Sequence, residues 1–310
     1  MNKPLISIIT LCYNHAEFLE ESIISIWEQD YPNIEIIVID DGSQDGSGEK
    51  LLELQKQSSF PMDIILQKNT GNIGLNLNRG IKKAKGEFIS FLSCDDKLAP
   101  NIFFKLFAAI NKDTNIQFVI PKEYFLFGSR NNDIFDAVLQ NSFTKTFDNS
   151  IDKMLELEKE GGSFFVQGTL LRKSIIDAVR GFDEDMLGDD IVLRVKMLQH
   201  IKKNPPMKFD VIEGYTFCYR MHENNIHLKG ERQCKILYQV MMRYFPGQQS
   251  KELQKWVEHI WKQYVKKGEF KKALNLFFSN MNSKKFLHFR KIIFHSIKYY
   301  IRKNKFKAKK

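Results

Sequence analysis

Two pairs of adjacent aspartates are the residues of this sequence best suited to chemistry. Asp40 and Asp41 follow the apolar run IEIIVI, and Asp95 and Asp96 follow the run EFISFLSC. Carboxylates this close together repel one another unless a cation or hydrogen-bond donors offset their charge. Hard cations such as Mg²⁺ and Mn²⁺ prefer oxygen ligands and commonly bridge a protein carboxylate to a substrate diphosphate. The pairs therefore indicate a divalent-cation site for a phosphorylated ligand, with a helix-capping turn as the alternative for each pair.

The elements around these pairs predict an α/β fold that brings both pairs to one edge of a parallel sheet. Short apolar runs suit strands that are buried on both faces, and segments with apolar residues at helical spacing separate them. Ligands bind at the carboxyl ends of such strands. The predicted strands are residues 5–11, 34–40, 63–67 and 87–92. The predicted helices are residues 16–29 with Asn14 as cap, 48–57, a short helix that ends at 85 after a loop over 68–80, and 174–179.

Composition and spacing disfavour several other classes of protein. The chain has 310 residues, of which 43% are hydrophobic, so it can bury a sizeable core. Its four cysteines stand far apart without a CxxC pair, which argues against a disulfide scaffold or a zinc site and fits a reducing cytosol. No GxGxxG follows the first strand, so a nicotinamide dehydrogenase is disfavoured. We also expect no signal peptide and no transmembrane helix, because polar residues follow the first apolar run and no stretch is long enough.

The net charge of +10 is unevenly distributed along the chain. Residues 228–310 contain 22 Lys and Arg against 4 Asp and Glu, a net charge of +18, whereas residues 1–227 contain 25 against 33, a net charge of −8. We therefore expect a catalytic domain over 1–227 and a basic amphipathic helical region over 228–310. Mixed aromatic and basic helices lie at anionic membrane surfaces; a solvated face over a packed helical subdomain is the alternative. Nucleic-acid binding is disfavoured because no recognition motif is present.

The opening stretch, PLISIITLCYNHAEFLEESIISIWEQDYPNIEIIVIDDGSQDGS, resembles that of the family 2 glycosyltransferases, which are inverting enzymes with the GT-A fold. Weaker motifs of the same family follow in order down to about residue 227. The resemblance implies a Rossmann-like, nucleotide-binding mixed sheet flanked by helices, followed here by an α-helical C-terminal extension. It also implies transfer of a sugar from a nucleotide-sugar, most often a UDP-sugar, to an acceptor hydroxyl.

The resemblance implies donor-binding residues near the strand ends. Tyr13 resembles the tyrosine that stacks near the nucleotide base, and Asp41 resembles the carboxylate that reads the edge of the base, usually uracil. The asparagine of the following loop is either Asn69 or Asn72. The expected donor contacts are Leu11, Tyr13, Asp40, Asp41, Asn78, Arg79, Asp95 and Arg220.

The resemblance also implies a divalent metal, Mn²⁺ or Mg²⁺, as cofactor. Asp95 and Asp96 resemble the DXD motif, which holds the metal and the donor ribose. His222, in the segment YRMHENN, resembles a histidine that completes the metal shell, with a purely structural histidine as the alternative. Ser93 departs from the pattern, because the family often has a further aspartate there. This departure makes a catalytically inactive nucleotide-sugar-binding relative the alternative function.

A third acidic pair, Asp189 and Asp190, resembles the catalytic pair of the acceptor half. Asp190 would be the general base, which takes the proton of the acceptor hydroxyl as it attacks the anomeric carbon opposite the leaving UDP. A helix N-terminus stabilised by its dipole is the alternative. By analogy, the acceptor would be a saccharide, in particular a polyprenyl-linked one of capsule, O-antigen or exopolysaccharide assembly. The protein would then be cytoplasmic and peripheral on the inner face of the membrane.

Overall fold

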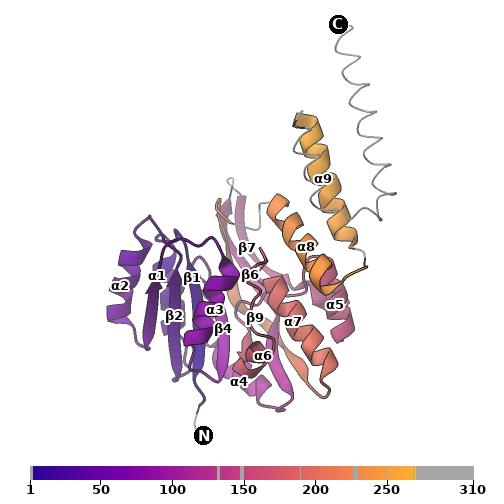
Figure 1. The fold of residues 1–310 in the computed structure, drawn as a ribbon. Helices are drawn as coiled ribbons and strands as arrows, with labels where there is room; N and C mark the ends of the chain where they lie inside the picture. Colours follow the sequence, from indigo (N-terminus) through magenta and orange to yellow (C-terminus); the bar gives the residue numbers. More distant parts are fainter. Residues whose placement is uncertain are drawn as a thin grey trace, which may run out of the picture. The chain divides into compact units, whose positions relative to one another are not determined.

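The amino-terminal part of the sheet has the predicted alternation of strands and helices. The computed structural model describes residues 3–130, 133–146, 150–188, 190–225, 230–248, 250–267 and 269. The parallel strands, in the order β3-β2-β1-β4, are β1 (Ile6–Cys12), β2 (Ile34–Asp40), β3 (Met62–Leu66) and β4 (Phe88–Ser93) (Figure 1). Cys12 pairs with Asp40, and Leu11 pairs with Ser93. The ends of β1, β2 and β4 are therefore level, and the two aspartate pairs lie at one sheet edge as predicted.

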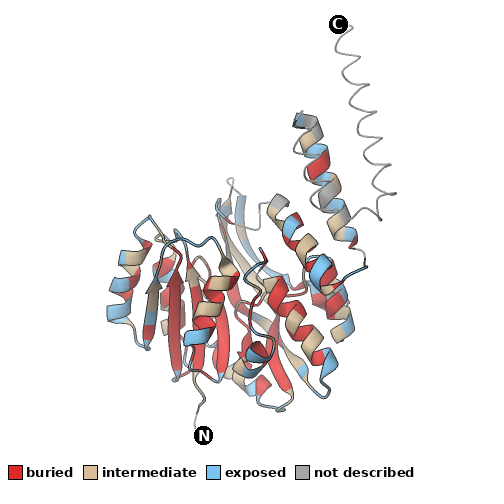
Figure 2. Cartoon of the chain, in the orientation of Figure 1, coloured by how far each residue is buried: buried red, intermediate tan, exposed pale blue. Residues whose placement is uncertain are grey.

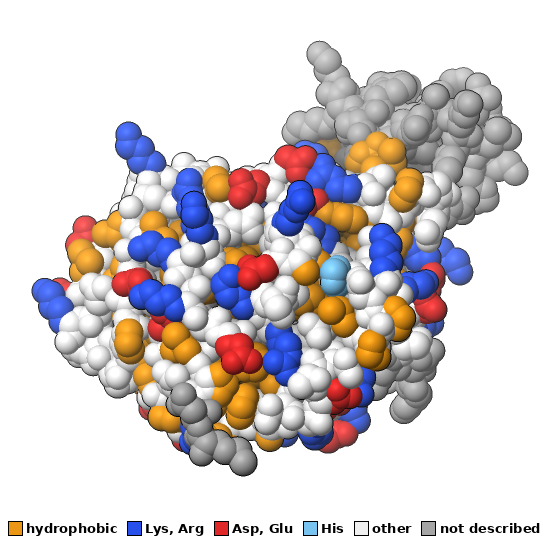
Figure 3. All heavy atoms as spheres, turned by 60° about the horizontal axis from the view of Figure 1, so that its bottom comes forward, with side chains coloured by type: hydrophobic (Ala, Val, Ile, Leu, Met, Phe, Trp, Pro, Cys, Tyr) orange, Lys and Arg blue, Asp and Glu red, His pale blue; other side chains and the backbone are white. Residues whose placement is uncertain are grey.

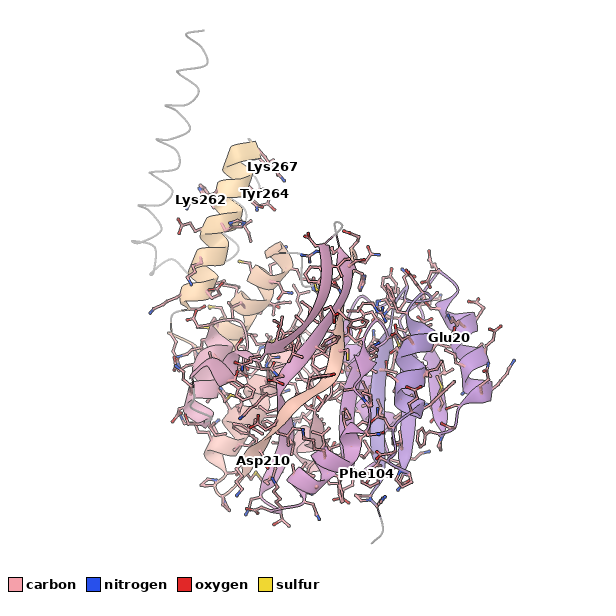
Figure 4. The ribbon with its side chains drawn as sticks, turned by 180° about the vertical axis from the view of Figure 1, so that it is seen from behind. Glu20, Phe104, Asp210, Lys262, Tyr264 and Lys267 are labelled. Carbon is pink, nitrogen blue, oxygen red and sulfur yellow. The ribbon has the colours of Figure 1, made fainter. Side chains whose placement is uncertain are left out.

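Helices cover both faces of this sheet. On one face, a shared hydrophobic core joins the strands to α1 (Leu19–Trp27), α2 (Ser47–Gln57) and α4 (Ile102–Ile110). On the opposite face lies α3 (Ile73–Lys83), whose Gly80 approaches Ile9 and Ile39 so closely that a side chain would not fit. All seven residues of β2 are buried, and Figure 2 shows buried strands between helices that are buried on one side only. Figure 4 views the face that carries α1, with Glu20, and α4, with Phe104.

The prediction of a loop over residues 68–80 is wrong, because α3 begins at Ile73, within this segment. The segment is rich in glycine and asparagine, which suggested a loop. However, the side chain of Asn72 accepts a hydrogen bond from Leu75 N at 2.9 Å and so caps the helix. Leu77 and Ile81 are buried at helical spacing, so tertiary packing outweighs the weak helix propensity of the segment.

The helix predicted over residues 16–29 is shorter than expected and is not capped by Asn14. It begins at Leu19, and no side chain among the described residues caps its first turn. Asn14 has a left-handed backbone with φ of 56°, and its Oδ1 accepts a hydrogen bond from Gln44 N at 2.9 Å. Asn14 therefore ties together the two loops that follow β1 and β2.

Beyond β4 the sheet continues with strands of both directions, so it is mixed as predicted. These strands are β5 (Lys97–Leu98), β6 (Ile116–Arg130), β7 (Asp133–Gln140), β8 (Leu170–Arg172) and β9 (Lys208–Met221). Strand β8 pairs antiparallel with β4 and β6, β9 runs parallel to β6, and β7 pairs antiparallel with β6. The helical elements are η1 (Ser142–Thr146), α5 (Ile151–Lys159), α6 (Lys173–Ala178) and α7 (Asp190–Lys203), and α6 confirms the helix predicted near 174–179.

The chain divides into two compact units, residues 1–158 with 162–225, and residues 159–161 with 226–310. The second unit contains α8 (Gly230–Tyr244) and α9 (Lys251–Lys267), and Figure 4 labels three residues of α9. The part of the predicted basic region beyond residue 269 lies outside the described residues. In the described ranges, no helix is both long enough and apolar enough to cross a bilayer.

Charges of both signs are mixed on the face of the molecule that Figure 3 brings forward. Lys and Arg side chains lie beside Asp and Glu side chains over this face. Surface ion pairs of the first unit include Lys112 with Asp210 at 3.3 Å and Lys208 with Asp113 at 2.6 Å. Binding to nucleic acid relies on clustered basic side chains, and those drawn in colour on this face are not segregated into such a patch.

Candidate functional site

Asp41, at the carboxyl end of β2, holds the segment that follows β3. Its Oδ1 accepts hydrogen bonds from Gln67 Nε2 at 2.8 Å, Thr70 N at 2.8 Å and Thr70 Oγ1 at 2.9 Å, and its Oδ2 accepts one from Gly71 N at 3.1 Å. Burial alone would raise the pKa of Asp41, but these donors stabilise the carboxylate and hold its pKa below the usual value. An ionised Asp41 therefore fixes the loop over residues 67–71.

Arg79 lies on α3 and supports Asp41 through an intermediate residue. Its guanidinium donates to Gln67 Oε1. The Nε2 of Gln67 in turn donates to Asp41 Oδ1 at 2.8 Å and to the buried Asn76 Oδ1 at 2.6 Å. Arg79 was expected to contact the donor. In the structure it contacts Gln67, which in turn contacts Asp41.

Asn78 and Asn72 connect α3 to the segment that precedes α7. Asn78 Oδ1 accepts a hydrogen bond from Phe182 N at 2.9 Å, and its Nδ2 donates to Phe182 O at 3.0 Å. Asn72 Nδ2 donates to Glu184 O at 2.6 Å, while its Oδ1 caps α3. Asn69 is exposed. Of the two loop asparagines considered, Asn72 is therefore held by protein partners, and Asn69 faces solvent.

Leu11, Tyr13 and Asp40 lie at the predicted edge with different exposures. Tyr13 directly follows β1, and 49% of its surface is exposed. Leu11 is half-buried, and Asp40 is buried. Asp40 Oδ1 accepts hydrogen bonds from Ser43 N at 3.2 Å and from the Ser43 hydroxyl. Tyr13 is therefore the residue of the three that can offer an open aromatic face, whereas Asp40 shapes the turn after β2.

His15, which the sequence reasoning missed, lies beside Asp95. Its backbone N–H donates to Ser47 Oγ at 3.0 Å, and the neighbouring Ala16 N donates to Asp45 Oδ2 at 2.9 Å. These bonds fix the loop so that His15 Nε2 lies 3.8 Å from Asp95 Oδ2. Burial lowers the pKa of His15, which favours the neutral imidazole. Its position directly after the end of the first strand was the signal that could have revealed it.

Asp95 is the carboxylate of the DXD-like pair with an unused oxygen. His222 Nε2 lies 3.1 Å from Asp95 Oδ2. Burial would raise the pKa of Asp95, but His222 and His15 stabilise the carboxylate and bring its pKa to about 2. Its Oδ1 is buried and has no hydrogen-bond partner in the part of the chain that the structure describes. A buried, ionised oxygen without a partner is costly unless a cation or donor joins it.

Asp96 differs from its neighbour because protein donors occupy both of its oxygens. Its Oδ1 accepts a hydrogen bond from Arg220 N at 2.7 Å, and its Oδ2 accepts one from Gln167 Nε2 at 2.8 Å. Burial and the charge of Asp95 together raise the pKa of Asp96 well above its usual value. The two aspartates of one pair therefore have opposite environments, which sequence alone does not reveal.

Arg220 fastens the turn that carries Asp95 and Asp96. Its Nε donates to Asp95 O at 2.8 Å, and its guanidinium pairs with Glu21. The guanidinium carbon also lies 4.8 Å from the ring centre of Phe18 and 4.4 Å from that of Phe127. Arg220 was expected among the donor contacts, and the structure places it against the backbone of the DXD-like turn.

Asp190 is the first residue of α7 and is linked to the same turn through two neighbouring residues. Its Oδ2 accepts a hydrogen bond from Val166 N at 3.0 Å. The next residue, Gln167, accepts from Ser93 N through Oε1 at 2.7 Å and donates to Asp96. Asp189 lies outside the described residues.

Gln167 was also missed by the sequence reasoning. Its role depends on an isolated backbone β-bridge between Phe91 and Gln167. These residues are far apart in the chain, so the contact leaves no local sequence pattern.

The donor set fits a divalent cation, although the protein alone does not complete a shell. In the described part of the chain, no group of three or more His, Cys, Asp or Glu side chains could hold a metal ion. Asp95 nevertheless offers one oxygen, Oδ1, that has no partner within the described ranges, and the imidazole of His222 lies beside its other oxygen, Oδ2. Oxygen with imidazole suits Mn²⁺, and such sites usually obtain further ligands from substrate phosphates and water.

Comparisons with known proteins agree with this architecture. The family model described as "Glycosyl transferase family 2" matches residues 7–179. An uncharacterized glycosyltransferase of Rickettsia typhi is 32% identical over 171 residues, which are 55% of this chain and 52% of that protein. TuaG of Bacillus subtilis, a glycosyltransferase named for teichuronic acid biosynthesis, is 34% identical over 95 residues, or 31% of this chain and 37% of that one. The chain spans about half the length of the Rickettsia relative.

Two solved structures share the fold at low sequence identity. TarS residues 1–349 of S. aureus, solved in complex with UDP-GlcNAc, has a TM-score of 0.59 at 18% identity and covers 96% of this chain and 81% of that one. The mannosyltransferase PcManGT of Pyrobaculum calidifontis, solved with GDP-Man and Mn²⁺, has a TM-score of 0.55 at 16% identity and covers 80% of this chain and 66% of that one. These likenesses support the mixed α/β fold with helices on both faces.

Proposed function

Because the chain belongs to glycosyl transferase family 2, we propose that it transfers a sugar from a nucleotide-sugar, with UDP as the nucleotide, to a hydroxyl of a saccharide acceptor. The observation that carries the proposal is Asp95, at the edge that also bears Asp41: its Oδ2 contacts His222, and its buried Oδ1 has no hydrogen-bond partner among the described residues. A divalent cation would balance the charge at this edge and would in turn bind a phosphorylated ligand.

The base of the donor lies along the ends of β1 and β2 in this proposal. Tyr13, half exposed, stacks on the base, and the loop held by Asp41 borders it. Arg79 and Asp40 keep this loop and the neighbouring turn in place from behind. Asn69 is the exposed asparagine of the loop and is the better placed of the two considered.

Asp95 and His222 would hold Mn²⁺ or Mg²⁺, with Asp96 and Arg220 fixing the turn that presents Asp95. When bound, the cation neutralises the diphosphate and the charge that develops on the leaving UDP. Asp96 was expected among the direct ligands. Its two hydrogen bonds favour a supporting position, whereas Asp95 has an oxygen to spare.

Asp190 acts as general base in an inverting transfer. The acceptor oxygen forms the new bond to the anomeric carbon while the bond from that carbon to the diphosphate oxygen breaks, and Asp190 receives the hydroxyl proton. Its position at the start of α7, joined through residues 166 and 167 to the DXD-like turn, supports this role. Asp189 would assist as the other member of the acidic pair.

The acceptor is a saccharide, in particular a polyprenyl-linked one of capsule, O-antigen or exopolysaccharide assembly. A relative named for teichuronic acid biosynthesis supports a cell-surface polysaccharide. The net charge of +18 over residues 228–310 supports attachment to an anionic membrane, which would make the protein peripheral on the cytoplasmic face.

The proposal is tested by screening UDP-Glc, UDP-Gal, UDP-GlcNAc and GDP-Man for release of the nucleoside diphosphate and for a shift in melting temperature, with Mn²⁺ and with EDTA. Metal-dependent release from one UDP-sugar is the expected result. Thermal stabilisation without any release, for every donor and with added lipid-linked saccharides, would instead favour the inactive binding relative suggested by Ser93.

A further inference from the structure

A buried ion pair lies directly behind Asp190. Arg194, one helical turn further along α7, donates from Nε to Glu158 Oε1 at 2.9 Å. The side chains are 6% exposed for Arg194 and 0% for Glu158. Burying two charges is costly unless the geometry is good and further hydrogen bonds satisfy them. Stability alone is therefore a weak explanation for an ion pair at this position.

Glu158 is a rigid anchor for the arginine. Its Oε1 also accepts hydrogen bonds from Ser163 N at 3.1 Å and from the Ser163 hydroxyl. Gly162 has a φ of +132° and passes so close to Arg194 that an added Cβ would lie 2.5 Å from the guanidinium NH2. A side chain at position 162 would therefore displace the guanidinium, and the glycine lets the chain wrap around it.

The same guanidinium reaches the proposed general base. Arg194 NH1 lies 3.7 Å from Asp190 Oδ2, the oxygen that also accepts from Val166 N at 3.0 Å. The guanidinium carbon lies 5.6 Å from the ring centre of Phe164, which belongs to the same segment as Val166. Arg194 thus contacts both Asp190 and the residues that flank it.

We propose that Arg194, locked by Glu158, is a positioning residue for Asp190. The guanidinium is planar and presents its donors in a fixed fork, so an arginine that is held at Nε by Glu158 has its NH1 directed toward Asp190. Asp190 Oδ2 is therefore held both by the charge of Arg194 and by the N–H of Val166. This inference rests on the proposed function, because it takes Asp190 as the base.

The test uses Arg194→Lys in the full-length protein. Lysine keeps a positive charge that can pair with Glu158, but its ammonium group lacks the planar, forked set of donors of a guanidinium. The variant therefore keeps the ion pair with Glu158 and loses the directed contact with Asp190. The probe is the nucleotide-sugar of the screened panel that the wild type turns over fastest, with Mn²⁺ and with water or saccharide as acceptor. A displacement of about 1 Å can lower a rate about 10²-fold, so we expect a loss of that size with UDP affinity within about twofold of wild type.

A double-mutant comparison separates positioning from a general structural effect. If Arg194 acts through Asp190, Arg194→Lys should change the residual rate of Asp190→Asn by less than about twofold. An equal loss in both backgrounds, or a loss of UDP affinity as large as the loss of rate, overturns the inference. Arg172→Lys is the matched control, because Arg172 is also largely buried and lies 3.5 Å from Glu87 but does not contact Asp190.

Two further measurements keep the test decisive. Glu158→Gln keeps the size of the side chain, removes the charge that orients Arg194, and should give the same pattern; wild-type rates in both variants overturn the inference. Crystal structures of wild type and Arg194→Lys give a readout without turnover, in which Asp190 Oδ2 should leave Val166 N while Asp96 keeps its partners, and an unmoved Asp190 contradicts the inference. If Asp190→Asn alone has the wild-type rate, the base assignment fails instead.

Discussion

Gln167 Nε2 lies 2.8 Å from Asp96 Oδ2, although 71 positions separate the two residues in the sequence. The same side chain accepts a hydrogen bond from Ser93 N at 2.7 Å. One glutamine, from the segment just ahead of β8, therefore braces both ends of the turn that carries Asp95. The same segment contributes Val166 N, which donates to Asp190, so Asp190 and the DXD-like turn are joined at these two residues.

Gln167→Leu should weaken the metal-dependent binding of UDP about tenfold. The leucine leaves Asp96 Oδ2 and Ser93 N buried without a partner, a loss of about 1–3 kcal/mol, part of which the turn recovers by shifting. Calorimetric titration of UDP with and without Mn²⁺ measures the effect. Gln57→Leu, the same substitution at an exposed position near the end of α2, is the control and should bind as wild type does.

Asp95→Asn should abolish the gain in UDP affinity that Mn²⁺ confers, because the amide lacks the charge that attracts the cation. Asp96→Asn should reduce the gain only in part, since its effect reaches the metal through the turn. EDTA should bring the wild type to the affinity of Asp95→Asn. The assignment of Asp95 fails if its variant keeps full metal-dependent binding while Asp96→Asn loses it.

Asp190→Asn should lower the rate of sugar transfer about 10²–10⁴-fold, the usual contribution of a general base. Asparagine is nearly isosteric with aspartate but does not take a proton. UDP and metal affinities should stay near wild-type values, because Asp190 contacts neither in the proposal. A fall in UDP affinity as large as the fall in rate would place Asp190 in the donor site.

Asp41 should contribute to stability above pH 4 and lose this contribution in acid. Its native pKa is lowered from the usual value of 3.8, so the folded state gives up the proton more readily than the unfolded chain does. The contribution is therefore full above the unfolded pKa and disappears as the pH falls through the lowered native pKa. Urea unfolding of wild type and Asp41→Asn from pH 7 to pH 3 should show a difference at pH 7 that narrows toward pH 3; a constant difference contradicts this account.

The full-length protein should bind anionic vesicles at 0.1 M salt and leave them at 1 M salt. The Debye length falls from about 10 Å to about 3 Å over this range, which screens the basic region from the lipid charge. Co-sedimentation with phosphatidylserine-containing vesicles measures the binding, and neutral phosphatidylcholine vesicles are the control. A protein that remains in the supernatant with both lipids at low salt does not attach by charge.

The sequence predicts the frame of the site better than its details. The apolar runs that end in Asp40 and Asp95 fixed the strands and their shared edge, because burial on both faces leaves a strong local pattern. The start of α3 was missed because packing of Leu77 and Ile81 outweighs local propensity. Distant contacts such as that of Gln167 with Asp96 depend on the path of the chain between them, so no nearby residue signals them.

The level ends of β2, β1 and β4 give the edge of the sheet a fixed length scale. Strand β1 lies between the other two, so the ends of β2 and β4 are separated by two interstrand spacings, about 9.6 Å. Backbone hydrogen bonds set this separation, and side-chain substitutions leave it unchanged. Substitutions at either strand end therefore change the side chains that are presented there, whereas the distance between the two strand ends is set by the fold itself.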